Sequence, residues 1–585
     1  MFSNDRTSRR ALLRRGTMLG GGLAGAALIG CSSAPKKSVT QNAPQAAATS
    51  AAPASQPASG RAGVPVVQGA PKRGGTWSES IAETSPQQDM NTATNQSIWQ
   101  QISERALALD PWGATVQPNI VEKWESPDTT TFILHVRKGV KIHNKAPWNG
   151  REFDAEDLAF NMNRMVGNTA ESEGLKKTAF PRADSLPGMT AAEVVDKSTV
   201  RVKLSKPSFA FLTGLAEYRN VLMPKGIVEV GFKDPNKFAG IGAFQVENWQ
   251  EGVREQFTRH EAYYKKDQPY FDKFTRQVVP DRAARLAGFI SKQFTTFPSP
   301  NLQDEKTAKG ARPDVLTYSV PGSNWHNLRF NMKTGPFLDI RIRKAMQLSL
   351  DYGEIGDGYY GPGWAYMSAF HPNFKEAWNE DKVKTLPGYN PATKAKDRDE
   401  AHKLMAAAGR ANGDGMAFDL MLPSGSPSSD AFRENCLRFQ GQMQKVFSGM
   451  KVTMKPTTDF ASFAKLQNEG TFQIVAYSIV AIPDIAQEAY SQYHSKGSRN
   501  YGRFENAEAD ALIEKLQNEL KPEGRKELVE QFQQKYVNEW QTMIQLYIPP
   551  SKSMLQPNIG GYDKVVGPWG NGTPNERIGS YYSVS

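Results

Sequence analysis

The pattern of apolar and polar positions predicts an α/β protein from about residue 73 onward. Phe132, Leu134 and Val136 alternate with mostly polar neighbours, which is the period of a strand with one buried face. Residues 138–139, Lys-Gly, then end this strand in a turn. The segment 153–160 opens a helix, because acidic residues occupy its first turn, where the helix dipole favours them.

Two further helices are predicted near the C-terminus. Asn506 has the character of an N-cap, and it is followed by an apolar stripe of Leu512, Ile513, Leu516 and Leu520. A second helix follows Pro522, with one apolar face formed by Leu528, Val529, Phe532, Tyr536, Trp540 and Met543. We interpret both faces as parts of a hydrophobic core.

The first 31 residues have the pattern of an export signal. Arg9 and Arg10 lie in a segment that resembles the twin-arginine export motif. The apolar run that follows, residues 16–30, is shorter than the ~20 residues that cross a bilayer, so a signal peptide is favoured over a transmembrane helix. The run ends in Leu-Ile-Gly-Cys, which resembles a bacterial lipobox with Cys31 as the lipidated residue. We therefore expect an exported protein, held by lipid at the outer face of the cytoplasmic membrane or in the periplasm.

Residues 31–73 are dominated by Ala, Ser, Pro, Gln and Gly and contain few large apolar side chains. Such a composition cannot bury enough surface to fold. The sequence predicts a disordered tether between the lipidated Cys31 and the folded body.

The distribution of charge argues against a nucleic-acid partner. The formal net charge is +11, and the first 73 residues carry +9 of it, which leaves about +2 for the body. The two cysteines, Cys31 and Cys436, exclude a disulfide framework and a cysteine-based zinc site. Cys436 lies in an amphipathic stretch and is expected to be a small buried apolar residue.

Motifs for catalysis and cofactors give little support for an enzyme. Residues 356–361 satisfy the Gly-x-Gly-x-x-Gly dinucleotide pattern, but they follow a helix-like segment rather than a strand, which favours a flexible turn. The seven histidines lack metal-site spacing, and no Gly-x-Ser-x-Gly elbow occurs. We expect no cofactor and no protein-built metal site, and an exported hydrolase stays as the enzymatic alternative.

The stretch 131–143 with 150–158 contains an alternating strand, an Arg-Lys-Gly turn, a second strand and the start of a helix. Residues 331–345 contain a run of Asn, Pro-Phe, Asp, Arg-x-Arg and Ala. In this order, and together with segments 73–77, 118–125, 240–244, 279–286, 401–409 and 506–513, they resemble the extracellular solute-binding proteins of bacterial ABC importers, family 5. Members of that family bind oligopeptides, dipeptides, nickel complexes and some oligosaccharides.

This resemblance implies a two-lobe, periplasmic-binding-protein-like α/β fold (type II, large cluster) with a hinge and an extra domain inserted near the N-terminus. The protein would capture a peptide or similar small organic solute and deliver it to an ABC permease, as a monomer and without chemistry. The expected divisions are a signal peptide at 1–30, the tether at 31–73, lobe I at 74–115, 206–318 and 546–585, the inserted domain at 116–205 and lobe II at 319–545.

The resemblance also locates a candidate ligand site. Oligopeptide binders of this family carry charged side chains beside a Gly-Thr-Phe strand, which is 470–472 here. By ungapped counting, the two positions that are basic in those binders are occupied here by Gln467 and Ala476. The position that is acidic in them is occupied here by Ile482. A peptide clamped by its charged ends is therefore in doubt, unless a shifted loop lets Asp484 replace the acid. An oligosaccharide or another neutral solute is the alternative ligand.

Aromatic and amide side chains near these segments would suit such a neutral ligand. Trp325, Phe460 and Tyr477 would form stacking walls, with core packing as the alternative for each. Asn324 and Asn327 lie where the family's ligand groove begins, and amides suit neutral polar groups. The predicted ligand contacts are Asn324, Trp325, Asn327, Phe460, Gln467, Tyr477 and Asp484.

Overall fold

The computed structural model describes residues 63–84, 88–92, 98–110, 115–208, 210–424, 429–567 and 574–584. These ranges all belong to one compact unit, Ala58–Ser585. The predicted export residues Arg9, Arg10 and Cys31 lie outside the described residues. Among the helices that are described, none is long and apolar enough to cross a membrane.

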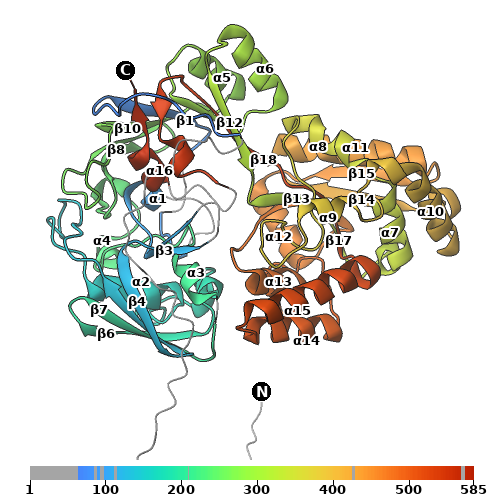
Figure 1. The fold of residues 1–585 in the computed structure, drawn as a ribbon, viewed down its shortest axis with the longest axis horizontal. Helices are drawn as coiled ribbons and strands as arrows, with labels where there is room; N and C mark the ends of the chain where they lie inside the picture. The colour runs from blue at the N-terminus through green and yellow to red at the C-terminus, as the bar shows by residue number, and fades with distance from the viewer. Residues whose placement is uncertain are drawn as a thin grey trace, which may run out of the picture. The chain divides into compact units, whose positions relative to one another are not determined.

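A five-stranded mixed sheet forms the centre of lobe II (Figure 1). Its strand order is β15-β14-β16-β13-β17, and β14 runs parallel to both β15 and β16. Strand β13 runs antiparallel to β16 and β17 on its two sides. The strands are β13 (Asn324–Phe330), β14 (Ala417–Leu422), β15 (Lys451–Pro456), β16 (Ile474–Val480) and β17 (Met543–Tyr547).

Helices surround this sheet and form two separate hydrophobic clusters with it. One cluster includes Leu328, Leu420 and Phe439, and the other includes Ile479 and Phe532. The helices are α7 (Ile340–Ser349), α8 (Tyr352–Tyr360), α9 (Glu380–Lys384), α10 (Lys394–Ala407), α11 (Ser429–Val446), α12 (Phe460–Glu469), α13 (Ile485–Tyr493), α14 (Ala507–Asn518) and α15 (Pro522–Lys535). A π-helical turn (Tyr536–Trp540) extends α15.

Two smaller sheets build lobe I from segments that are far apart in the sequence. A four-stranded sheet has the order β1-β10-β9-β8, and a three-stranded sheet has the order β11-β18-β12. The strands are β1 (Thr76–Ile81), β8 (Phe244–Gln250), β9 (Arg254–Arg259), β10 (Lys273–Val278), β11 (Thr296–Pro298), β12 (Leu316–Pro321) and β18 (Pro550–Leu555).

An antiparallel sheet of four strands, in the order β4-β5-β7-β6, lies between β1 and β8 in the sequence. Helix α2 (Ala155–Met165) packs on this sheet and begins with a capping box between Asp154 and Asp157. The strands are β4 (Val121–Asp128), β5 (Thr131–Val136), β6 (Met189–Asp196) and β7 (Thr199–Leu204).

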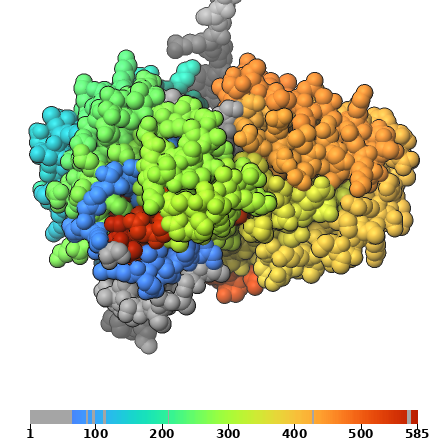
Figure 2. All heavy atoms as spheres, turned by 90° about the horizontal axis from the view of Figure 1, so that it is seen from above, coloured from blue at the N-terminus to red at the C-terminus, as the bar shows by residue number. Residues whose placement is uncertain are grey.

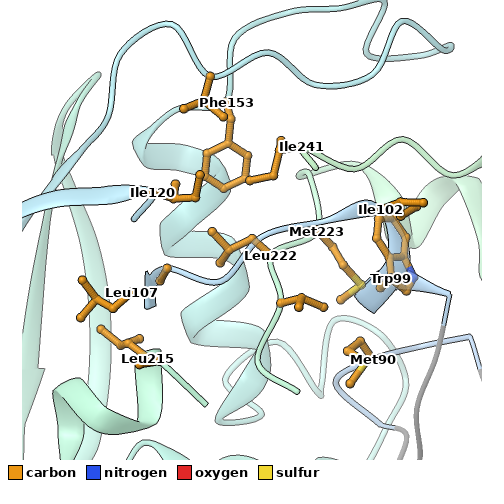
Figure 3. Close-up of a cluster of buried hydrophobic side chains, with 14 of the residues drawn as sticks. Met90, Trp99, Ile102, Leu107, Ile120, Phe153, Leu215, Leu222, Met223 and Ile241 are labelled. Carbon is orange, nitrogen blue, oxygen red and sulfur yellow. The ribbon is translucent and has the colours of Figure 1, made fainter. Parts of the chain in front are cut away.

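One hydrophobic core joins this four-stranded sheet to lobe I. Figure 3 shows part of the core, where Trp99, Phe153 and Leu222 converge from three segments of the chain. In Figure 2 the C-terminal residues (red) lie beside the N-terminal part of the body (blue), and the Trp77 and Tyr581 ring centroids are 5.1 Å apart. The remaining elements are α1 (Trp99–Ile102), β2 (Leu107–Leu109), β3 (Val116–Pro118), α3 (Phe211–Leu215), α4 (Ile227–Val230), α5 (Arg282–Ile290), α6 (Leu302–Ala311), β19 (Ile559–Gly560), α16 (Pro574–Ser580) and β20 (Tyr582–Ser583).

Two neighbouring connections carry the chain between the lobes. Strand β12 pairs with β18 in lobe I, and the chain passes from β12 directly into β13 and from β17 directly into β18. At the crossing point, the Gly322 N–H donates to the Pro549 carbonyl oxygen at 3.2 Å, and His371 bonds the Gly322 carbonyl at 2.9 Å. Two short adjacent connections are the arrangement that a hinge requires, because few dihedral angles must change when the lobes rotate.

Several local predictions are confirmed. Phe132, Leu134 and Val136 are buried on one face of β5, and Asn506 caps α14 by accepting from the Ala509 N–H. Cys436 is buried in the core of lobe II.

Three other predictions fail at element ends and Gly-rich segments. Leu520 is exposed because α14 ends at Asn518, and Met543 belongs to β17 because the helical turn before it ends at Trp540. The segment 356–361 is not a flexible turn: it lies within α8 and its C-cap.

The predicted tether also extends too far toward the body. Val64 is buried in the lobe I core, and the Ser319 N–H donates to the Gly63 carbonyl at 2.7 Å. The Lys72 N–H bonds the Ser583 carbonyl at 2.9 Å. Packed structure therefore begins before residue 74.

Candidate functional site

A cavity of about 160 Å³ lies between two walls that are distant in sequence. One wall consists of residues 181–185, from the inserted domain whose core is joined to lobe I, and of residues 210–214 and 217–220 of lobe I. We call it the lobe I wall. The other wall consists of the loop after β16, residues of α13, and residues 498–499. Gln487 Nε2 donates to the Asp184 carbonyl at 3.4 Å and so connects the two walls. A ligand in this cavity would contact both lobes.

Arg182 contributes a buried guanidinium to the lobe I wall. The residue is 7% exposed, and its Nε donates to the Met90 carbonyl at 2.9 Å. Its Nη2 atom is buried and has no hydrogen-bond partner within the described part of the chain. Burial lowers the pKa of Arg182 to about 10, although the negative charge of Glu217 partly opposes this. A buried, charged donor without a partner is costly, so it marks a candidate binding position.

Glu217 does not supply that partner, because Arg219 occupies its carboxylate. Arg219 Nε donates to Glu217 Oε1 at 2.7 Å, and the Arg219 backbone N–H donates to Oε2 at 2.9 Å. Burial would lower the pKa of Arg219, but the Glu217 carboxylate outweighs burial and raises it. Burial would likewise raise the pKa of Glu217, and Arg219 and Arg182 together lower it. The three side chains form a wall with one positive charge in excess.

Asp484 lines the opposite wall, but both of its carboxylate oxygens have partners within lobe II. Oδ1 accepts from the Gln487 N–H at 2.8 Å and caps α13, and Oδ2 accepts from Arg525 Nη2 at 2.8 Å. The Asp484 and Arg525 side chains are 4% and 2% exposed. The idea that Asp484 meets a ligand amine stays a prediction, and a ligand would have to compete with Arg525 for it.

Three more polar side chains line the cavity. Arg499 is half-buried, and its Nη1 donates to the Val480 carbonyl at 2.9 Å. The buried Ser491 Oγ and Asn220 Oδ1 have no hydrogen-bond partner among the described residues. Buried polar atoms of this kind are satisfied by ordered water or by a ligand.

The predicted residues of β13 lie beside the predicted Tyr477 of β16. Asn327 pairs with Tyr477 across the two strands, and its Nδ2 donates to the Tyr477 carbonyl at 3.1 Å. Asn324 Nδ2 donates to Ser478 Oγ at 3.1 Å. Trp325 is 1% exposed and packs in a lobe II core cluster, so it offers no stacking wall in this structure.

Phe460 and Gln467 both lie on α12, where a row of rings leads toward Tyr477. The ring centroids are 5.9 Å apart for Phe460 and Phe463, 5.8 Å for Phe463 and Tyr477, and 5.7 Å for Tyr477 and Tyr501. Gln467 is 3% exposed, and the described residues offer no partner to its Nε2.

Tyr477 connects this aromatic row electrostatically to the cavity walls. Burial and the neighbouring Tyr501 raise the pKa of Tyr477 to about 12, and the charges of Arg499, Arg329 and Arg219 oppose the rise. Arg499 and Arg219 line opposite walls of the cavity. Of the predicted contacts, Asp484 lines the cavity and Tyr477 lies within electrostatic reach of both walls.

No sequence pattern identified four of the cavity residues, Arg182, Arg219, Asn220 and Arg499. Counting along lobe II predicts charged contacts on that lobe alone, whereas Arg182, Arg219 and Asn220 come from loops of the lobe I wall that have no hydrophobic periodicity. Within the ranges described above, no cluster of three or more His, Cys, Asp or Glu side chains is placed to hold a metal ion.

Comparison with known proteins agrees with the two-lobe architecture. The chain is 27% identical over 487 residues to heme-binding protein A of Haemophilus influenzae, which covers 79% of this chain and 84% of that protein. It is 26% identical over 381 residues to the dipeptide-binding protein of Escherichia coli, which covers 62% and 66%. The structure of DppA from Helicobacter pylori, in complex with the peptide STSA, superposes with a TM-score of 0.72 at 18% identity and covers 88% of this chain and 99% of that one.

A family model provides the assignment. Residues 115–501 match the model "bacterial extracellular solute-binding proteins, family 5 Middle", which is more than half of the chain. The two-lobe α/β fold of the solved relatives is the fold described above. This chain belongs to the bacterial extracellular solute-binding proteins of family 5, a substrate-binding and non-enzymatic family.

Proposed function

We propose that this protein is the solute-binding lipoprotein of an ABC importer. It captures a peptide or a similar small organic solute between its two lobes and delivers it to a membrane permease. No bond is made or broken in this process. The observation that carries the proposal is the cavity whose walls come from both lobes, beside two short crossing connections.

Ligand binding and lobe closure are coupled in this arrangement. Contacts to residues 181–220 and to residues 482–499 can form together when the walls face each other. A solute that touches both walls therefore binds the closed form more tightly and shifts the population toward it. A permease can then distinguish loaded from empty protein by the relative position of the lobes.

A peptide is the favoured solute. Relatives in the family are named as dipeptide-binding and di/tripeptide-binding proteins, and one solved relative holds a nonapeptide. A neutral oligosaccharide is less favoured, because Arg182, Arg219 and Arg499 bring to the cavity the charge that the counted lobe II positions lack. Another relative is named as a heme-binding protein, which keeps a larger organic acid within the range of solutes to be tested.

Export and anchoring are part of the proposal, based on Arg9, Arg10 and Cys31. Cys31→Ala should release the protein from the membrane fraction, and the pair Arg9→Lys with Arg10→Lys should retain it in the cytoplasm. A Cys31→Ala protein that still fractionates with membranes would refute the lipid anchor.

The main test is to purify the protein from its native host, denature it and identify the released small molecules by mass spectrometry. Solute added back to stripped protein should raise the melting temperature and reduce the radius of gyration in X-ray scattering. The control is protein titrated with the same mass of glucose. If a co-purified solute binds and neither observable changes, the two-lobe capture is wrong.

A further inference from the structure

The cavity contains a positive charge that no described acidic residue neutralises by contact. Arg182 is more than nine-tenths buried, and one hydrogen bond, from Nε to the Met90 carbonyl, holds its guanidinium. The described residues supply no acceptor for its Nη2. A guanidinium presents five donors in a planar fork, so most donors of Arg182 have no acceptor in the described part of the chain.

The three acidic residues that line the cavity, Asp184, Glu217 and Asp484, make no ion pair with Arg182. The Glu217 carboxylate accepts from Arg219 through both oxygens. Asp484 accepts from Arg525 and from the α13 backbone. Asp184 is exposed at the cavity edge, where solvent screens its charge.

The missing partner is therefore an anion rather than a neutral group. A sugar hydroxyl could accept one hydrogen bond from Arg182, but it would leave the buried charge uncompensated. A carboxylate accepts two parallel hydrogen bonds from the guanidinium fork and neutralises one charge. A cavity of about 160 Å³ has room for such a terminal group and its adjoining atoms.

The neighbouring polar atoms fit the group next to a carboxylate. Asn220 Oδ1 is a buried acceptor without a partner in the described structure, and Ser491 Oγ is available from the other wall. An amide N–H of the solute would satisfy Asn220, and its carbonyl oxygen would accept from Ser491. A free carboxylate beside a peptide bond has this set of groups.

We propose that Arg182 binds a carboxylate of the transported solute, so that the acid group is recognised by the lobe I wall and not by the Gly-Thr-Phe strand of lobe II. The solute class is an organic acid or zwitterion, such as a peptide with a free C-terminus. This inference rests on the proposed function, because it names the solute of the same cavity.

The test uses two probes, an equimolar pool of di- to pentapeptides with free C-termini and the same pool with amidated C-termini. Stripped mature protein is incubated with each pool, and retained peptides are quantified by mass spectrometry. The variants are Arg182→Gln, which removes the charge, and Arg182→Lys, which keeps it without the fork. Arg254→Gln, an exposed arginine of β9, is the matched control.

We expect the wild type and Arg254→Gln to retain free acids over amides by at least about tenfold, because a hydrogen bond to a charged group is worth one to two decades of affinity. Arg182→Gln should lose this preference, and Arg182→Lys should keep part of it. Melting temperatures of the stripped variants show whether each is folded. If Arg182→Gln does not fold, the acid-to-amide ratio of Arg182→Lys decides.

Each remaining outcome is decisive. Equal retention of acids and amides by the wild type, or an unchanged preference in Arg182→Gln, overturns the carboxylate site and leaves the solute-binding function standing. If neither pool is retained and the native host supplies a neutral solute, the carboxylate site is again overturned. If no solute co-purifies and neither pool is retained, the proposed function itself fails.

Discussion

Two buried arginines reach the same short segment, residues 88–92, and their surroundings differ sharply. Arg164 is 1% exposed, and its guanidinium donates to Asp89 at 2.6 Å, to Glu173 at 2.8 Å and to Asn91 at 2.9 Å. Burial would lower the pKa of Arg164, but the two carboxylates outweigh burial and raise it. Arg182 donates to Met90, and burial lowers its pKa to about 10.

The difference separates a structural arginine from a candidate binding arginine. A buried charge that is fully paired contributes to a defined fold, whereas a buried charge without a partner costs stability until something binds it. Both arginines contact the same segment, so the part of the chain that they reach does not explain the contrast. Arg182 lines the cavity and Arg164 does not.

The largest expected effect comes from Arg164→Met. This change leaves Asp89 and Glu173, which are 15% and 9% exposed, without their shared cation. Breaking a buried ion pair costs about 3–5 kcal/mol of unfolding free energy. Urea denaturation of the stripped protein measures this loss. A loss below about 1 kcal/mol would show that the two arginine sites do not differ as described.

Asp484→Asn compares the paired acid of the cavity with the unpaired Arg182. Asparagine retains the α13 cap but removes the charge that accepts from Arg525, so we expect a loss of about 2 kcal/mol. Affinity for free-acid peptides should stay within about twofold, because both carboxylate oxygens serve the fold. If peptide binding is lost while stability is unchanged, Asp484 is the amine contact that the shifted-loop hypothesis requires.

The elements and the site differ in how much of them the sequence could reveal. The alternation in 131–136, the acidic first turn of the helix at 153–160 and the cap at Asn506 are local patterns, and each predicted its element. Leu520 and Met543 were misplaced because an apolar stripe does not show where a helix stops. The glycines at 356–361 satisfy a motif, but Gly356 and Gly358 lie inside α8 and Gly361 is its C-cap, and Trp364 packs against Gly356.

The cavity could not be predicted in the same way. Its walls join residues 181–220 to residues 482–499, and the meeting of these loops depends on the whole fold. Counting from residues 470–472 assumed that the charged contacts stay on lobe II. The partners that occupy Asp484, and the absence of one for Arg182 Nη2 within the described ranges, are properties of packing and not of spacing.

Acid sensitivity should come from buried histidines and not from either arginine site. Both guanidinium groups stay charged between pH 7 and 5.5, because the pKa of Arg164 is raised and the pKa of Arg182 is about 10. Burial lowers the pKa of His371, beside the crossing connections, to about 4 from its usual 6.5. The unfolded chain therefore binds more protons between these values, and stability falls as the pH drops below 6.5.

The expected size of this effect is roughly 1 kcal/mol for His371 between pH 7 and 5.5. His371→Asn should reduce the difference between the unfolding free energies at these two pH values by that amount. Half-buried His402 supplies the matched control, His402→Asn. An identical pH dependence in wild type and His371→Asn would contradict the assignment.

The smallest expected effect, and the one of opposite sign, comes from Arg182→Met in the stripped protein. Methionine fills a similar volume without a charge, so the unfolding free energy should stay the same or rise by up to about 1 kcal/mol. Ligand-induced stabilisation by the free-acid peptide pool should disappear in the same variant.

Arg343 is the matched control, because it is 3% exposed and burial also lowers its pKa to about 10. Arg343 differs from Arg182 in its contacts, because all three of its guanidinium nitrogens donate to backbone carbonyls, those of Phe337, Trp540 and Gln541. Arg343→Met removes these hydrogen bonds, so its unfolding free energy should fall by about 3 kcal/mol. The free-acid peptide pool should still stabilise this variant. Equal losses of stability in the two variants would show that Arg182 is a structural residue, since equal burial would then have equal consequences.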